Sequence, residues 1–139
     1  MSPLLDRAEF KRQVSLRSRG LCVLCRAPGD AAHHILDRAL FADGGYRLGN
    51  GAFVCAPCHW DCETTKVSVE DVRAAAGIVE AVLPPGFDPS LRYDKWGNVL
   101  REDGMRTPGP MARDDGCRRA LAKGGYLGLL IPWMDEDPV

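Results

Sequence analysis

The sequence of 139 residues is 45% hydrophobic and 27% charged, the composition of one globular domain with a modest core. This excludes a disordered tail or a fibrous protein, and no stretch approaches the roughly 18 to 20 apolar residues that a membrane span requires. The first residues lack the charged and then apolar build of a secretory signal, so we expect a cytoplasmic protein. A net charge of −1 argues against a protein that coats nucleic acid through bulk electrostatics.

The first predicted element is a helix over residues 4–18. Ser2 supplies an N-cap, Pro3 suits the first helical position, and Gly20 provides a stop. The other elements expected before residue 84 are, in chain order, a cysteine-containing turn at 21–26, a strand at 31–35, a glycine-rich loop at 43–51, a strand at 52–54, a helix from Pro57 to Thr64, a helix between Ser68 and Gly77, and a strand at 78–83. This mixture predicts an α+β fold.

The composition changes at Pro84, and the last 56 residues contain seven prolines and eight glycines. We therefore divide the chain into a domain over 1–83 and an extension over 84–139 that packs on it. Within the extension we expect a β-hairpin around Gly97-Asn98, or an ordered loop laid on the core, and a short helix at 118–123. An apolar run at 127–133 should pack on the core or on a partner, with Trp96 and Trp133 as buried anchors.

Four of the six cysteines form two C-x-x-C pairs, which are Cys22 with Cys25 and Cys55 with Cys58. In a reducing compartment this pattern favours a tetrahedral structural zinc site, because thiolates suit zinc and a two-residue gap lets both side chains of a turn face one ion. The alternatives are disulfides, a redox pair, or four unrelated buried thiols.

The chain has only three histidines, and all of them lie beside or between the cysteine pairs. His33 and His34 follow the first pair, and His59 directly follows the second. On a helix, His59 and Glu63 would lie on the same face because they are four residues apart. This clustering favours a second metal site or a catalytic site over isolated structural histidines.

Taken in order, these motifs resemble the HNH endonuclease family, also called the ββα-metal or His-Me finger nucleases, in its zinc-binding form. The resemblance covers about residues 10–66 and rests on Cys22-x-x-Cys25, His33-His34-Ile35, Asn50 and Cys55-x-x-Cys58-His59. It implies a small ββα-metal core with a structural zinc site of four cysteines, flanked by helices and by the Pro- and Gly-rich extension.

The resemblance also assigns roles to individual residues. It makes His34 the general base that deprotonates water, with Asn50 tying the loop to the backbone near that base. His33, His59 and Glu63 would hold the catalytic divalent metal, which could be Mg²⁺, Mn²⁺, Ni²⁺ or Zn²⁺. His33 stands where many family members have aspartate.

The implied activity is that of a metal-dependent endonuclease that hydrolyses phosphodiester bonds of nucleic acid, DNA rather than RNA. No membrane partner is expected. Because the first 30 residues hold six Lys or Arg against three acidic residues, we expect contacts with phosphates to begin there. The candidates for these contacts are Arg17, Arg19, Arg26, Arg38 and Arg47.

Two other functions compete with this interpretation. A non-catalytic zinc-stabilised module that binds nucleic acid or protein would keep the four cysteines, but it would leave the histidine doublet, Asn50 and Glu63 without a joint role. A hydrolase of small phosphodiesters is disfavoured because nothing in the sequence indicates a closed apolar pocket.

Overall fold

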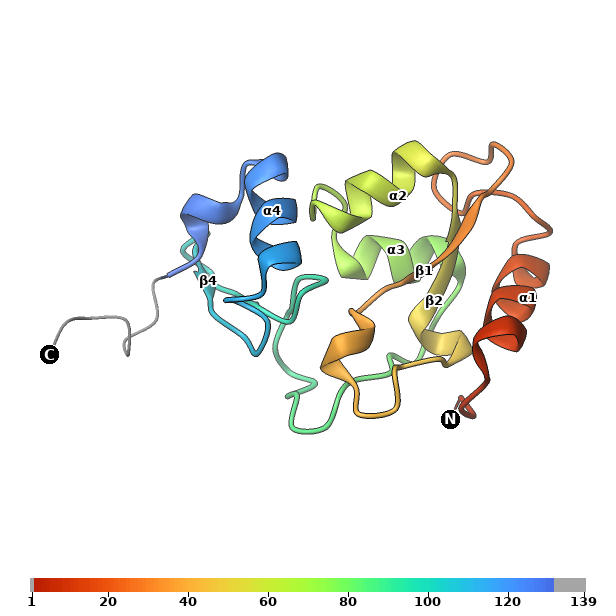
Figure 1. The fold of residues 1–139 in the computed structure, drawn as a ribbon, viewed down its shortest axis with the longest axis horizontal. Coiled ribbons are helices and arrows are strands. Elements are labelled where there is room, and N and C mark those ends of the chain that lie inside the picture. The colour runs from red at the N-terminus through yellow and green to blue at the C-terminus, as the bar shows by residue number, and fades with distance from the viewer. Residues whose placement is uncertain (1, 132–139) are drawn as a thin grey trace, which may run out of the picture.

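A computed structural model describes residues 2–131 and shows an α+β fold with two small antiparallel sheets (Figure 1). The described part of the chain has four α-helices, and none is long and apolar enough to cross a membrane. The elements are, in chain order, α1 (Arg7–Arg17), β1 (Ala31–His34), β2 (Gly51–Val54), α2 (Ala56–Glu63), α3 (Val69–Ala76), β3 (Val99–Leu100), β4 (Arg106–Thr107) and α4 (Asp115–Gly124). Short 3₁₀ turns occur at Arg38–Leu40, Leu48–Asn50 and Leu127–Leu129.

The first sheet carries the histidine doublet. β1 and β2 pair antiparallel, with His33 opposite Ala52 and His34 opposite Gly51. Both strands agree with the sequence prediction to within a residue at each end. Since successive side chains of a strand point to opposite faces, the two histidines leave β1 on different sides of the sheet.

This sheet is covered on both faces (Figure 1). On one face, Phe53 packs with Phe10 and Val14 of α1. On the other, Ala52 and Val54 enter a larger core with α2 and α3. The α1 helix lies very close to β2. A Cβ added to Gly51 would lie only 2.6 Å from a methyl group of Val14. Glycine at position 51 therefore permits the contact between helix and strand.

The predicted start of the first helix is wrong. The structure begins α1 at Arg7, and the carboxylate of Asp6 is the cap, accepting a hydrogen bond from the Glu9 N–H at 2.8 Å. The Ser2 hydroxyl instead accepts from the Gly49 N–H at 3.1 Å, and Leu4 forms a β-bridge with Arg47. Contacts with a distant loop thus hold residues 2–4 outside the helix.

The two helices after β2 follow their local signals. The α2 helix starts after Cys55 and has Pro57 in its first turn. The Ser68 hydroxyl caps α3 by accepting from the Asp71 N–H, and Gly77 ends it in a left-handed conformation with φ of 75°. Both elements confirm the prediction.

The strand predicted at 78–83 is wrong. These residues have no strand partner among residues 2–131, and Val79 is fully exposed. Ile78 and Val82 pack singly against the core instead. Apolar character alone made this segment resemble a strand, but a strand also needs a free edge to pair with.

The extension forms a turn and a second small core. Asp94 N–H donates to Asn98 C=O at 2.9 Å around the predicted Gly97-Asn98 turn, but the β3 strand that follows pairs with β4. The residues on the two sides of the turn also pair, through an antiparallel bridge between Tyr93 and Val99, so the hairpin prediction is confirmed and β4 adds a further partner to β3. The α4 helix includes the predicted 118–123 segment and packs against Trp96, whereas Trp133 lies outside the described residues.

Polar contacts fasten the extension to α2. The Arg106 guanidinium donates to Asp94 and to Thr65, each at 2.9 Å, and all three residues are buried. The Trp96 indole N–H donates to the Glu63 carbonyl at 2.9 Å. The last residue of α2 is thereby held directly by the extension.

Candidate functional site

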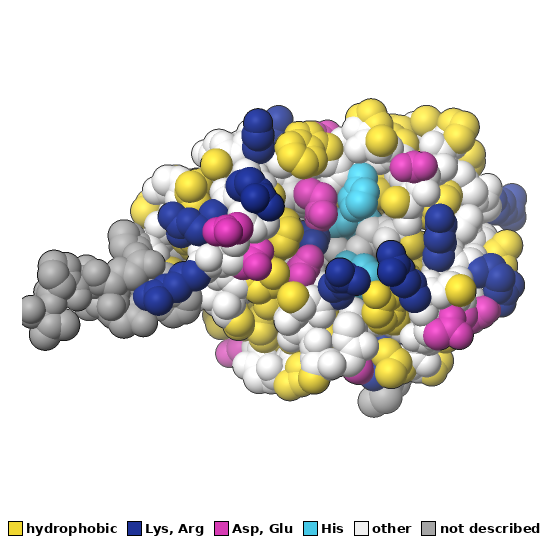
Figure 2. Space-filling model, viewed as in Figure 1, with side chains coloured by type: hydrophobic (Ala, Val, Ile, Leu, Met, Phe, Trp, Pro, Cys, Tyr) yellow, Lys and Arg dark blue, Asp and Glu magenta, His cyan; other side chains and the backbone are white. Residues whose placement is uncertain are grey.

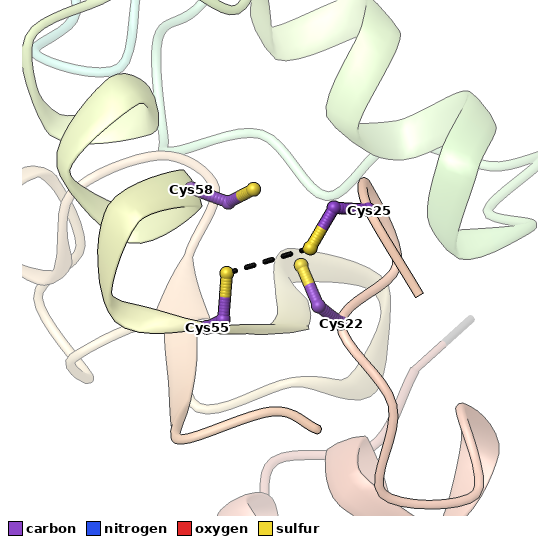
Figure 3. A group of neighbouring side chains, drawn as sticks. All are labelled: Cys22, Cys25, Cys55 and Cys58. Carbon is purple, nitrogen blue, oxygen red and sulfur yellow. Dashed lines mark hydrogen bonds between the residues drawn. The ribbon is translucent and has the colours of Figure 1, made fainter. Parts of the chain in front are cut away.

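The four paired cysteines meet in one cluster between the 22–25 turn and the start of α2 (Figure 3). Their sulfur atoms all lie within 4.8 Å of one another, and the Cys25 and Cys55 sulfurs are 3.6 Å apart. Tetrahedral zinc with Zn–S bonds of about 2.3 Å separates its sulfurs by about 3.8 Å, whereas a disulfide is about 2.05 Å long. The cluster therefore has the dimensions of a zinc site, and none of its members is in a disulfide.

The protonation of these thiols also fits a cation at this place. Burial opposes ionisation of Cys22, but N–H groups of Cys55, Cys25 and Leu24 donate to its sulfur and lower its pKa to about 6. Burial and the neighbouring sulfurs raise the pKa of the Cys58 thiol. Four sulfurs this close cannot all ionise without a compensating positive charge, and bound zinc would supply one.

The two remaining cysteines lie outside the cluster. Burial raises the pKa of Cys62 and of Cys117 to about 12. Each packs in a hydrophobic core, Cys62 with α3 and Cys117 with Trp96. They therefore act as small apolar side chains.

A second cluster of potential metal ligands contains His33, His59 and Glu63. One ligand atom from each residue lies within 4.8 Å of the other two. His33 comes from β1, and the other two lie one turn apart on α2, as their spacing predicted. The rings of His33 and His59 are 5.1 Å apart, and His33 Nδ1 is 3.7 Å from Glu63 Oε2.

The buried polar atoms of this cluster fit a cation. His33 is 2% exposed, and its Nδ1 has no hydrogen-bond partner among the described residues. Glu63 Oε2 is also buried and accepts no hydrogen bond from the described residues, although it lies 3.0 Å from Lys95 Nζ and 3.7 Å from His33 Nδ1. Burial, together with the charge of Lys95, lowers the pKa of His33 well below its usual value, so its nitrogen is free to ligate.

His34 lies beside this cluster on the other face of β1. Its ring stacks on Phe10 at 4.8 Å and meets the edge of Tyr46 at 4.9 Å. Its Nε2 is buried and has no hydrogen-bond partner in residues 2–131. Burial, followed by the charge of Lys95, lowers the pKa of His34 to about 4. Two aromatic rings thus hold a neutral imidazole with one unused nitrogen.

Asn50 fixes the backbone that follows the doublet. It is 1% exposed, and its amide group donates to the Leu36 carbonyl and accepts from the Leu36 N–H, both at 3.0 Å. It also donates to the Gly45 carbonyl at 3.3 Å. Asn50 therefore ties the loop before β2 to the backbone two residues beyond His34, and its part in catalysis stays a prediction.

The histidines and Glu63 line one hollow of about 680 Å³. Figure 2 shows the histidine side chains in a depression, with Lys and Arg side chains on both sides. Three further cations that the sequence did not single out line this hollow, namely Arg7 and Lys11 of α1 and Lys95 of the extension. The four-residue spacing of Arg7 and Lys11 was a usable signal, whereas nothing local to Lys95 indicated that it lies in the site.

Lys95 is a buried cation between two carboxylates. Its Nζ lies 2.5 Å from Asp37 Oδ1 and 3.0 Å from Glu63 Oε2, and its side chain is 6% exposed. Although burial opposes it, the pair with Lys95 lowers the pKa of Asp37. Lys95 therefore links the extension, the loop after β1 and the end of α2.

Of the five arginines expected to contact phosphates, the structure places only Arg38 in this hollow. The Arg17 guanidinium donates to the carbonyls of Leu48 and Gly51, so it supports the loop before β2. Arg47 donates to the Ser2 carbonyl and to Asp43. Arg19 and Arg26 line a separate hollow beside the cysteine turn.

Comparisons with protein-family models, with curated proteins and with solved structures found no match for this chain. We therefore infer the function from the geometry of the two clusters and the hollow.

Proposed function

We propose that this protein is a metal-dependent endonuclease that hydrolyses phosphodiester bonds of nucleic acid, with a core of the ββα-metal type. One observation carries the proposal, namely that three potential metal ligands converge in the same hollow as a neutral histidine with an unused nitrogen. The order β1, β2, α2 in the chain supports it, because β1 contributes His33 and His34, α2 contributes His59 and Glu63, and β2 connects them and pairs with β1.

In this proposal His34 is the general base. A phosphodiester resists attack because its negative charge repels the incoming oxygen, so a water molecule must lose a proton as it attacks. The low pKa of His34 keeps its imidazole neutral and able to accept that proton. Phe10 and Tyr46 hold the ring in one orientation, which keeps its unused Nε2 at a fixed position.

The remaining residues bind the cation and the phosphate. His33, His59 and Glu63 would hold a divalent cation, which supplies positive charge to the phosphate as negative charge builds up on it. Two nitrogens and one carboxylate suit Mn²⁺, Ni²⁺ or Zn²⁺ better than Mg²⁺, which prefers oxygen ligands. Arg38, which lines the same hollow, is placed to attract the phosphodiester.

The cysteine cluster has a structural role in this proposal. Four thiolates around zinc leave no position open for water or substrate, so that ion would not take part in chemistry. Cys55 and Cys58 lie at the start of α2, and Glu63 lies at its end. Zinc would therefore fix the helix that carries His59 and Glu63 relative to the 22–25 turn.

The test is nicking of supercoiled plasmid DNA in Mn²⁺ buffer by the wild-type chain and by His34→Ala. We expect the variant to keep its far-UV circular dichroism and zinc content and to lose about 10²- to 10⁴-fold in rate, the usual contribution of a general base. Arg92→Gln, an exposed residue outside the hollow, serves as the control with full activity. If the wild type cleaves no DNA or RNA with any divalent cation tested, the non-catalytic binding module is the correct function.

A further inference from the structure

A second hollow, of about 550 Å³, adjoins the histidine site on the side of the extension. Its walls are α2 and α4, and it is lined by Trp60, Arg119 and Lys123 among others. His59 and Glu63 line both hollows. The two hollows therefore meet at the proposed metal ligands His59 and Glu63, and we refer to them together as the groove.

The extension places two cations in this groove. Arg119 and Lys123 are four residues apart on α4, so they lie on the same face of the helix, and both are exposed. Neither has an ion pair or a side-chain hydrogen bond within the described range 2–131. The opposite face of α4 is buried through Cys117 and Leu121, which fixes the direction of the two cations.

The other end of the groove has a matching pair. Arg7 and Lys11 lie four residues apart on α1, are exposed, and line the hollow that contains His34. Lys and Arg side chains accordingly lie on both sides of the histidines in Figure 2. A polyanion that followed the groove would meet one cationic pair before the site and the other after it.

Trp60 adds a stacking surface at the α4 end. It is 52% exposed, although a side chain of this size usually buries most of its surface. It directly follows His59 on α2 and has no ring or cation contact in the described part of the chain. A large exposed aromatic ring beside two free cations has the chemistry of a platform for an unpaired base.

We propose that this groove binds a single-stranded segment of nucleic acid, with one base stacked on Trp60 and the adjoining phosphates paired with Arg119 and Lys123. The inference rests on the proposed function and specifies its substrate, since the phosphate beyond the stacked nucleotide would lie over His59 and Glu63. A duplex would not fill this subsite, because its bases stack on one another and offer no face to Trp60.

The experiment measures binding of a fluorescein-labelled single-stranded 20-mer DNA and of the corresponding duplex by anisotropy, without added divalent cation and without chelator. We expect the wild type to bind the single strand at least ten times more tightly than the duplex. Trp60→Ala should weaken single-strand binding by about 5- to 150-fold, the range of a lost base stack, whereas Trp60→Phe should retain most of the affinity. An equal effect on the duplex would overturn the proposal.

The cations are tested by the dependence of binding on salt. Arg119→Gln combined with Lys123→Gln should reduce the slope of log affinity against log salt by about 1.4, the value for two phosphate contacts on a single strand. The control is Arg92→Gln combined with Arg101→Gln, which removes the same charge at exposed sites outside the groove and should leave the slope unchanged. Equal slopes for the two double variants would refute the phosphate contacts.

These results separate the two proposals. If single-strand binding requires Trp60 but the protein cleaves no nucleic acid, the proposed binding groove stands and the proposed endonuclease activity is rejected. If the protein cleaves nucleic acid but neither Trp60→Ala nor the double variant changes its affinity for single strands, the proposed endonuclease activity stands and the proposed binding groove is rejected.

Discussion

Lys95→Met removes the cation between Asp37 and Glu63 and preserves most of the side chain's length and volume. In the wild type the Nζ atom lies 2.5 and 3.0 Å from the two carboxylates. At an effective dielectric constant of about 20, each contact corresponds to about 5 to 7 kcal/mol of Coulomb attraction, most of which the desolvation of the charges offsets. The variant also loses the cation–π contact with Trp96 at 4.1 Å.

The net cost follows from the charges that remain. Removing one member of a buried ion pair destabilises a protein by about 3 to 5 kcal/mol, because the other charge stays buried without a partner. The Glu63 side chain is 28% exposed, so water screens part of this effect, and we expect a loss of about 2 to 4 kcal/mol in the free energy of unfolding. Urea denaturation followed by far-UV circular dichroism measures this loss.

Addition of Mn²⁺ tests whether this is the proposed metal site. With Lys95 gone, a cation at Glu63 no longer competes with the ammonium group, so Mn²⁺ should stabilise Lys95→Met more than the wild type. Equal stabilisation of the two proteins by Mn²⁺ would contradict the reasoning, as would a variant that unfolds at the same urea concentration as the wild type.

Three further predictions concern the fold and the cysteine cluster. Without added divalent cation, the stability conferred by neutral His34 should be complete above about pH 6.5 and decline toward pH 4, because folding lowers the pKa of His34 from 6.5 to about 4. His34→Gln should therefore flatten the dependence of Tm on pH, and an unaltered dependence would refute the assignment. Gly51→Ala should lower the free energy of unfolding, measured by urea denaturation, by about 1 to 3 kcal/mol, because the new Cβ would lie 2.6 Å from a side-chain atom of α1. Gly128→Ala, which has open space around it, should leave the free energy of unfolding unchanged, and equal effects of the two variants would contradict the close crossing. Cys25→Ser should lower the zinc content measured by atomic emission and reduce Tm, and full zinc occupancy in the variant would disprove its place among the ligands.

Local signals in the sequence predicted the elements that local chemistry determines. Ser68 caps α3, and Gly77 ends it in a left-handed conformation, so the sequence predicted both ends of this helix. The predicted cap of α1, Ser2, is not used, because its hydroxyl accepts a hydrogen bond from Gly49 far along the chain, and Asp6 caps the helix instead. The apolar segment at 78–83 failed as a strand for a similar reason, since pairing depends on which edges the rest of the fold leaves free.

The candidate site divides in the same way. The spacing of the cysteines and histidines predicted both groups of potential ligands, because side chains at these spacings in a turn or on a helix point in the same direction. Sequence could not predict that Arg17 turns inward to two carbonyl groups. Lys95 was equally hidden, because it enters the hollow only once the turn around Gly97 docks against the end of α2.

The central claim is that His33, His59 and Glu63 bind a divalent cation that phosphodiester cleavage requires. The most direct measurement is a titration of the zinc-loaded protein with Mn²⁺, following bound Mn²⁺ by electron paramagnetic resonance and plasmid nicking in the same samples. The account predicts one Mn²⁺ per chain, nicking that rises in parallel with occupancy, and loss of both in His59→Ala with the fold and the zinc retained. Nicking that proceeds at full rate in His59→Ala, or the absence of any Mn²⁺ site in the wild type, would contradict it.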